Sequence, residues 1–383
     1  MIIYFLEKKL VEQKTMTDNL ECVRDNKVTV LKALAILLVV SGHLEFSLLG
    51  MFTPYSFQLA LFFFISGYLF KEKYLDDVAN FVQRRARSLL LPYFWYNCFY
   101  LCVTVFIAKL TGKFWGMPIS LKNFFITPFL NGHQFDLSCP LWFVTQLFMT
   151  MIVFLFVFRV LRGIKNNKFF HLAVFAIIGV TAIPLSKVVA MTPLMLVVIR
   201  TMFSMFFVYL GYFYKHFIEG KYDILTVKWL GGVIILQSIL WLFNRDYDPV
   251  HGIGLSYVLV WARFDDQLIV PILTALTGIW ASLFTVKILY PYVKDIKFIN
   301  DMGNVTYHIM ANHLIVMYLL TAAFLNLHGI PLSERANHDI YWIYNPVQNT
   351  YFYFVVVMII TTFVGVWQQK AWKKFKSLFK HDV

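Results

Sequence analysis

The chain has 383 residues, of which 59% are hydrophobic and only 14% charged, whereas about a quarter of the residues in a soluble domain are charged. A single soluble core stops growing at about 250–300 residues, and no polar or Pro/Gly-rich linker divides this chain, so a soluble fold cannot bury this much apolar surface. The formal charge of +13 falls mostly in short segments between apolar runs and at the termini, a pattern that orients membrane helices and argues against nucleic acid as a partner.

Apolar runs predict ten membrane spans, because a span needs about 20 mostly apolar residues. In chain order they cover residues 28–51, 56–70, 89–110, 141–161, 169–185, 194–214, 229–243, 268–289, 305–327 and 351–367. With the N-terminus inside, the cytoplasmic segments carry about 23 of the 34 lysines and arginines and the opposite segments about 6. The sequence therefore predicts an all-α, multi-pass membrane bundle with both termini in the cytoplasm.

The termini flank one predicted membrane domain, residues 28–369. Residues 1–27 are polar and of mixed charge, and no small-residue cleavage site follows the first apolar run, so we expect a cytoplasmic segment and an uncleaved anchor. Residues 370–383 place aromatic and leucine side chains at helical spacing among lysines. That pattern is typical of a helix on an anionic leaflet, so membrane lipid is an expected partner.

The four cysteines predict neither a disulfide framework nor a metal site. Cys22, Cys98, Cys102 and Cys139 form no CxxC pair and no ligand spacing with histidine. We therefore expect no bound metal and no bound cofactor.

The outer segments, residues 111–140, 244–267 and 328–350, are longer and carry few positive charges. They contain several tyrosines together with Trp115, Trp261 and Trp342. These rings suit an interfacial belt or a carbohydrate-binding surface, and both interpretations stay open.

The first span contains three ionisable residues, each of which costs about 2.5–3.5 kcal/mol to insert. Lys32 and His43 are eleven residues apart, which places them within about 20° on one helical stripe with a rise of about 16 Å. Lys32 could instead extend to the headgroups, and His43 could be a neutral, hydrogen-bonded bundle residue. The other interpretation makes His43 a proton acceptor, since imidazole titrates near neutrality. Glu45 is expected to point away from His43.

Two arginines precede the third span. Arg84 and Arg87 are about one helical turn apart and are expected to face the same side. They either mark the cytoplasmic side or bind phosphates, for which the guanidinium fork is well shaped, and a coenzyme A donor has several phosphates. In the ninth span, His308 and His313 lie on different faces, so a shared metal is not expected.

Six short motifs follow one another along the chain. They are a basic residue and a histidine in the first helix, Ser-Gly after an aromatic run, Arg-x-x-Arg, Pro-Tyr-x-Trp, Leu-Trp-Phe and Gly-Asn-x-Thr leading to a histidine. In this sequence they are Lys32 and His43, Ser66 and Gly67, Arg84 and Arg87, Pro92, Tyr93 and Trp95, Leu141, Trp142 and Phe143, and Gly303, Asn304, Thr306 and His313. In the order and spacing of these motifs over about residues 26–366, the chain resembles the acyltransferase-3 family of ten-helix membrane O-acyltransferases, and within it the fucose acetylase and exopolysaccharide acetylase branch.

The resemblance implies transfer of an acyl group, most simply acetyl, from cytosolic acyl-CoA to a sugar hydroxyl on an exopolysaccharide, a cell-wall glycan or a lipid-linked sugar at the cell membrane. It implies the following roles: His43 and Lys32 are catalytic; Arg84, Arg87 and Lys32 bind acyl-CoA; Glu45, Trp142, Asn304 and His313 line the acceptor site or the bundle interior. The family more often has arginine at the position of Lys32. Lysine keeps the charge but loses the bidentate fork.

The strongest alternative is an exporter of polysaccharide or lipid-linked sugar, in which His43 and Lys32 form a proton relay. Exporters often contain internal repeats or helices broken near the midplane, and neither is evident in the sequence. A purely structural scaffold does not explain two ionisable residues on one stripe.

Overall fold

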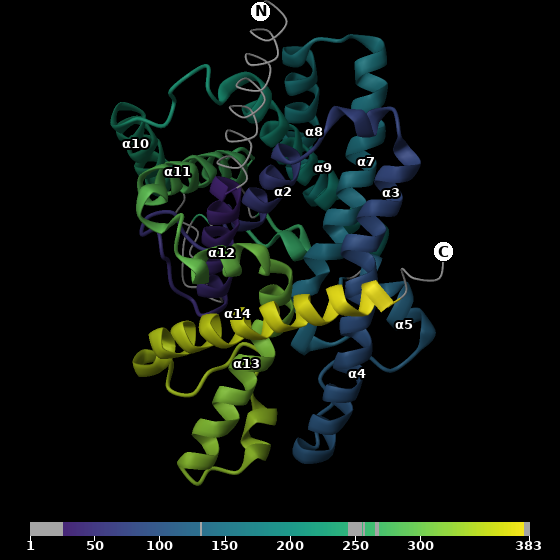
Figure 1. Cartoon of the computed structure of the whole chain (residues 1–383), viewed down its shortest axis with the longest axis vertical. Helices are drawn as coiled ribbons and strands as arrows, with labels where there is room; N and C mark the ends of the chain where they lie inside the picture. The colour runs from purple at the N-terminus through teal and green to yellow at the C-terminus, as the bar shows by residue number, and fades with distance from the viewer. Residues whose placement is uncertain (1–25, 131, 244–254, 256, 265–267, 379–383) are drawn as a thin grey trace, which may run out of the picture.

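A computed structural model describes residues 26–130, 132–243, 255, 257–264 and 268–378 (Figure 1). Most of the predicted segment 1–27, the cysteine Cys22 and the last five residues of the predicted tail lie outside this description. The α-helices are the first helix (Asn26–His43), α2 (Gln58–Tyr68), α3 (Val78–Arg85), α4 (Leu91–Thr111), α5 (Leu121–Phe125), α6 (Thr127–Leu130), α7 (Trp142–Ile164), α8 (Lys168–Val188), α9 (Pro193–Phe213), α10 (Val227–Phe243), α11 (Val270–Val293), α12 (Lys297–Asn304), α13 (Thr306–Leu327) and α14 (Pro346–Leu378). Short 3-10 helices form η1 (Glu72–Leu75), η3 (Asp136–Leu141), η5 (Leu259–Trp261) and η6 (Leu332–Asn337). Single π-helical turns form η2 (Ala86–Leu90) and η4 (Tyr214–Ile218).

The described part of the chain forms an all-α membrane bundle, as predicted. Eight of its helices are long and apolar enough to cross a membrane, and the two shorter apolar helices, α2 and α10, coincide with two further predicted spans. In Figure 1, α7, α8 and α9 run side by side along the long axis, whereas α14 crosses that direction. We call the end of the bundle at which the first helix begins the inner end, and the end at which it finishes the outer end, following the predicted orientation.

The first helix is shorter than the predicted span. It ends at His43 rather than near residue 51. The backbone N–H groups of Leu44 and Phe46 both donate to the carbonyl of Ser41, and Glu45 adopts a left-handed φ of 59°. This turn ends the helix and places His43 at its carboxyl end, not in its interior.

Glycines allow α2 and α9 to cross with their backbones in contact. A Cβ atom added to Gly67 would lie 1.7 Å from the carbonyl oxygen of Val208, and one added to Gly211 would lie 1.9 Å from that of Phe64. Small residues permit this close approach between membrane helices. The Ser-Gly motif therefore has a packing role, because Gly67 fixes α2 against the centrally placed α9, which also packs on α7 and α8.

A third close contact ties the first helix to α12. A Cβ atom on Gly303 would lie 2.1 Å from the carbonyl oxygen of Thr29, so the glycine of the Gly-Asn-x-Thr motif also serves packing. Beyond α12, α13 packs along α14. Helix α14 continues without a break into the predicted tail, where Trp372 packs edge-to-face on Trp95 of α4 at 6.3 Å between ring centroids. The tail's binding to a leaflet stays a prediction.

Candidate active site

His43 lies between two other rings at the outer end. The imidazole of His313, from α13, stacks on it with a centroid separation of 5.0 Å and an angle of 24°. The phenol ring of Tyr341 also stacks on it at 5.0 Å and 7°. Since each neighbouring ring restricts rotation of the imidazole, His43 is held in one orientation. The fold thus joins two predicted site residues, His43 and His313, and adds Tyr341.

A tyrosine fixes one nitrogen of His43. The hydroxyl of Tyr55 and Nδ1 of His43 share a hydrogen bond of 3.0 Å. Tyr55 itself has a left-handed φ of 60°, and its carbonyl accepts a bond from the N–H of Tyr257. A left-handed conformation costs a bulky residue about 1–3 kcal/mol, and such strain gathers at functional sites. The bond to Tyr257 holds Tyr55 in the conformation that reaches His43.

The imidazole of His43 borders a cavity of about 380 Å³. Glu45, Trp261 and Arg263 also line this outer cavity, and all three side chains are exposed. The volume falls within the range of small-molecule sites, which is about 300–1,000 Å³. Glu45 does not point away on a continued helix, as the sequence suggested, because the turn after His43 brings it to the same cavity.

His313 is fully buried, and its two nitrogens differ. Its Nδ1 lies 3.1 Å from the carbonyl of Ile309 in the preceding helical turn. Its Nε2 is buried and has no hydrogen-bond partner among the described residues. An unpaired buried polar group costs about 1–3 kcal/mol and calls for an explanation. This nitrogen belongs to the ring that stacks on His43.

A buried arginine supports the segment that carries Tyr341. Arg335 is 0% exposed and donates to the carbonyls of Asp339 (2.6 Å) and Ile340 (3.0 Å). Its guanidinium lies over the rings of Trp115 and Tyr318, 5.2 and 4.9 Å from their centroids. Burial lowers the pKa of Arg335 because its charged form loses water. The two carbonyls and the rings offset part of that cost.

Tyr341 is then fixed from two further sides. The Asp339 carboxylate accepts bonds from the backbone N–H groups of Tyr341 (2.7 Å) and Trp342 (2.9 Å). The hydroxyl of Tyr341 lies 3.3 Å from the thiol sulfur of Cys139, which lines the outer cavity. Burial raises the pKa of Tyr341 well above its ordinary value, so it remains a neutral phenol near pH 7. Its ring, rather than a phenolate, is what it presents to His43.

Trp142 forms another part of the outer cavity wall at the start of α7. The guanidinium of the buried Arg200 lies over its indole at 4.9 Å and donates to the carbonyl of Val260. Val260 lines the same cavity. Arg200 therefore fixes Trp142 and the segment around η5 together.

Comparison with known proteins identifies this bundle. The acyltransferase-3 family model, described as an acyltransferase domain, matches residues 25–367, nearly the whole chain. The chain belongs to the acyltransferase-3 family, and it is therefore a multi-pass integral membrane acyltransferase. No curated protein and no solved structure matches it.

The basic residues predicted for the acyltransferase donor site are dispersed. Lys32 is half-buried on the first helix and is not among the described residues that line the outer cavity. Arg84, at the end of α3, is exposed and donates through Nε to Asn80 at 2.9 Å. Arg87 follows in η2, where the change to a π-helical turn alters the spacing. A common Arg84–Arg87 clamp stays a prediction.

Arg87 instead borders a cavity of about 750 Å³ between α4, α13 and α14, together with Asn304 and His308. The hydroxyl of Tyr96 contacts Nδ1 of His308 at 2.8 Å and donates to Gln368 at 2.7 Å. Asn304 therefore lines a cavity that His313, which is buried against His43, does not line, although the sequence placed both in one acceptor or interior group.

The sequence does not predict Tyr55, Tyr341, Arg335 and Cys139 as site residues. Tyr341 is one of 21 tyrosines in the chain, and it contacts His43 through tertiary structure alone. The partial indication was the outer segment rich in tryptophan and tyrosine, for which a carbohydrate-binding surface stayed open. In the structure Trp115 and Trp342 surround Arg335, and Trp261 lines the outer cavity.

Proposed function

We propose that the chain is an O-acyltransferase that moves an acetyl or other short acyl group from cytosolic acyl-CoA to a hydroxyl of a cell-surface or lipid-linked sugar, with His43 as general base. The observation that carries the proposal is the fixed imidazole of His43 beside the outer cavity, bonded at Nδ1 to Tyr55 and stacked between His313 and Tyr341. A general base must stand within hydrogen-bond reach of the proton that it takes, and fixed rings favour that geometry.

In the proposed reaction the acyl group passes from the CoA sulfur to the acceptor oxygen, and the proton passes from the acceptor oxygen to the CoA sulfur. In the tautomer in which Nδ1 donates to Tyr55, the lone pair of His43 is on Nε2, which takes the proton of the acceptor hydroxyl. The hydroxyl oxygen attacks the thioester carbonyl carbon, the carbon–sulfur bond breaks, and the departing CoA thiolate receives the proton. A transient acyl-imidazole on His43 is the alternative route to the same products.

The carboxyl end of the first helix stabilises the protonated form of His43. His43 is the last residue of that helix, where the helix dipole places partial negative charge. A cation at such a position is stabilised by about 0.3–1 kcal/mol, and by up to about 2 kcal/mol where it is partly buried. The imidazolium formed when His43 takes a proton gains this interaction, whereas the neutral imidazole does not.

The outer cavity also suits a sugar acceptor. Trp261 is 50% exposed and lines it, and an exposed indole offers a flat apolar surface to a sugar ring. Glu45 and Arg263 add charged groups that accept from or donate to sugar hydroxyls. The acceptor hydroxyl would then reach His43 from the outer end while the acyl donor arrives from the inner end.

Replacement of His43 tests the proposal. His43→Gln should lower acceptor labelling at least about 100-fold, since general base catalysis contributes about 10²–10⁴-fold. The measurement is transfer of radiolabel from acetyl-CoA in membrane preparations with equal amounts of inserted protein. His328→Gln is the matched control, because His328 also stacks on a tyrosine at the outer end yet is exposed and does not line the outer cavity.

Normal labelling by a well-inserted His43→Gln variant contradicts the assignment of the base. The acceptor class has its own test, mass spectrometry of surface glycans with and without the gene. The proposal expects one acetyl mass per modified residue to disappear without the gene. Loss of the exported polymer would instead identify the chain as an exporter.

A further inference from the structure

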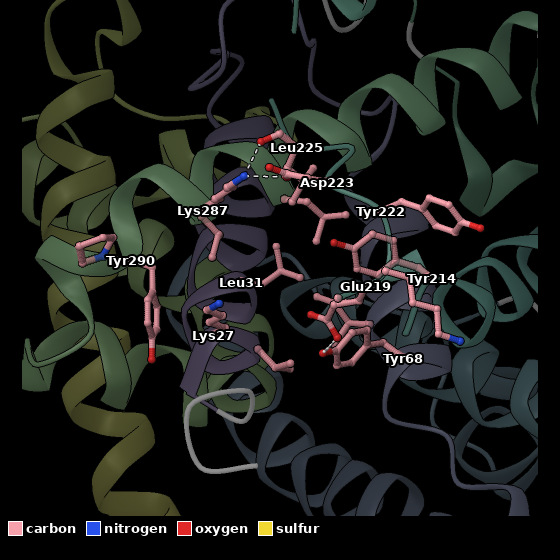
Figure 2. A pocket seen from close by; sticks show the side chains of 17 residues that line it. Lys27, Leu31, Tyr68, Tyr214, Glu219, Tyr222, Asp223, Leu225, Lys287 and Tyr290 are labelled. Atoms are coloured by element: carbon pink, nitrogen blue, oxygen red, sulfur yellow. Dashed lines mark hydrogen bonds and ion pairs between the residues drawn. The ribbon is translucent and has the colours of Figure 1, made fainter. Parts of the chain in front are cut away.

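A third cavity, of about 620 Å³, lies at the inner end of the same first helix (Figure 2). It is bounded by the first helix, α2, the segment after η4 and α11. Figure 2 shows Lys27, Leu31 and Lys287 around an opening that Tyr68 and Tyr214 border from another side. No motif or spacing in the sequence indicates this inner cavity.

The inner and outer cavities share one face of the first helix. Leu31 lines the inner cavity and Gly42 the outer one. They are eleven residues apart, so they lie within about 20° on one stripe, with a rise of about 16 Å. Between them, Ala35 and Leu38 are buried at 0% and 2% exposure, so packed side chains separate the two cavities, and an arm that joins them has to part the first helix from α2. The two cavities follow one another along this helix.

Helix α2 repeats the arrangement. Gln58 lines the outer cavity and Ile65 the inner cavity, seven residues apart and again within about 20° on one stripe. The chain thus presents the same faces of the same two helices to both cavities. A linear ligand that lies between these helices would have one end in each cavity.

The cavity beside Arg87 lacks this relation to His43. Tyr307 and His308 of α13 line it, whereas Met310 lines the outer cavity and His313 stacks on His43. From His308 to His313 the helix turns by about 500°, which places the two on different faces. The body of α13 therefore stands between Arg87's cavity and His43.

The inner cavity has the side chains that a nucleotide phosphate ligand requires. Lys27, Lys221 and Lys287 line it, against the carboxylates of Glu219 and Asp223. Lys287 pairs with Asp223 at 2.8 Å and also donates to the carbonyl of Leu225. Glu219 accepts a bond of 2.7 Å from Tyr68. Lysine ammonium groups bind phosphate as point charges, and these lysines outnumber the carboxylates.

Aromatic rings complete the cavity. Lys27 lies over the ring of Tyr290 at 5.5 Å, and Tyr222 is 65% exposed at the cavity edge. The segment that carries Tyr222 is tied to α11 through Lys287 and through a bond from Trp280 to the carbonyl of Ile224. A purine base stacks on such rings, as bases do on aromatic side chains elsewhere.

We propose that the inner cavity binds the nucleotide end of the acyl-CoA donor, with Lys27 and Lys221 contacting its phosphates and the acyl arm extending between the first helix and α2 toward His43. This inference rests on the proposed donor and moves its phosphate site from Arg84 and Arg87 to lysines outside the family motifs. It names a path of about 16 Å that only an extended arm can span.

Binding of CoA to the full-length chain in lipid nanodiscs tests the site without any turnover. Lys27→Gln with Lys221→Gln should weaken CoA binding about 10- to 100-fold, because each substitution removes a charge-assisted bond to a phosphate and exposed bonds of this kind are weaker than buried ones. Lys27→Arg with Lys221→Arg should restore most of the affinity. Lys228→Gln is the matched control, an exposed lysine at the start of α10 that does not line the cavity.

A second measurement does not depend on charge. Tyr222→Cys should react with a polar maleimide, and saturating CoA should slow that reaction at least about fivefold, because the label and the nucleotide occupy one cavity. Lys228→Cys should react at the same rate with and without CoA. Labelling of the native cysteines is measured on the unsubstituted chain and subtracted.

The outcomes separate this site from the proposed function. Unchanged CoA affinity in the double glutamine variant overturns the inner site, as does loss of binding in Arg87→Gln alone, which would place the donor beside α13. If the unsubstituted chain does not bind CoA, the donor of the proposed function is wrong, and the inner site with it. The role of His43 is judged separately, by acceptor labelling.

Discussion

The two ends of the first helix are built from opposite kinds of side chain. At the outer end, His43 is held by stacked rings, and the segment behind it is fixed by the buried Arg335. At the inner end, Lys27 and Lys221 are exposed, and their flexible side chains line the inner cavity. Bond-making requires side chains fixed to a fraction of an ångström, whereas binding of a charged ligand that must leave again tolerates mobile ones.

Backbone conformation shows the same contrast. Among the described residues, the non-glycine positions with left-handed φ are Glu45, Tyr55, Leu255, Ala262 and Asn345, and all lie in outer segments. Each such conformation costs about 1–3 kcal/mol and persists only where surrounding contacts impose it. The outer end is therefore strained and rigid, which is expected of a catalytic site. Breaking the supports of that end should affect rate, while changes at the inner end should affect donor binding.

Among the residues that support His43, the largest effect should come from Arg335. Arg335→Met removes the hydrogen bonds to the carbonyls of Asp339 and of the buried Ile340, of which the buried one costs about 1–3 kcal/mol to leave unpaired, and releases the segment that holds Tyr341 on His43. Since a misplacement of about 1 Å can cost about 100-fold in rate, we expect kcat to fall about 100-fold. The KM for acetyl-CoA should stay unchanged, because Arg335 lies at the other end from the inner cavity.

Arg335→Lys is the control for charge. It keeps the cation but cannot donate to both carbonyls with one planar fork, so it should restore only part of the rate. Thermal unfolding in detergent separates folding from positioning. A full kcat in Arg335→Met, or a rise in donor KM instead of a fall in kcat, would contradict the role of Arg335 as a positioning residue.

A smaller effect is expected at Tyr341. Tyr341→Leu removes the ring that stacks on His43, and an aromatic pair contributes about 0.5–1.5 kcal/mol, so kcat should fall up to about tenfold. Tyr341→Phe keeps the ring and loses only the contact with Cys139, so its rate should stay within about threefold of the original. Initial rates at saturating acetyl-CoA measure both. Equal losses in the two variants would mean that the hydroxyl, not the stacked ring, supports His43.

Much of the fold was predictable from the sequence, because a membrane span leaves a run of apolar residues and an all-α bundle follows from it. The end of the first helix at His43 was not predictable. Residues 44–51 are apolar enough to continue a span, and the helix stops because of a turn at Glu45 that local composition does not specify. The helix expected in the basic tail is continuous with α14 as far as Leu378.

The candidate site was predictable only where one helix carries it. Helical spacing indicated His43, and the motif order indicated His313 and Trp142. The contacts of Tyr55, Tyr341 and Arg335 depend on how outer segments fold back over the helix ends, which no periodicity encodes. The inner cavity escaped because its lysines are scattered over three elements and, in sequence, look like ordinary cytoplasmic charges.

The smallest expected effect sharpens the contrast between the two ends through ionic strength. Exposed charges are screened beyond about 10 Å at 0.1 M salt, so raising NaCl from about 50 to 250 mM should increase the acetyl-CoA KM two- to threefold. Since His43 is held by a hydrogen bond to Tyr55 and by stacked rings rather than by an ion pair, kcat should not change. Initial rates over a donor series at each salt concentration measure both constants. The Lys27→Gln, Lys221→Gln variant should show a flatter KM, because the screened lysines are gone. If salt lowers kcat and leaves KM constant, the charges that affect the reaction lie at the outer end. The assignment of donor binding to the inner end and of catalysis to the outer end would then be wrong.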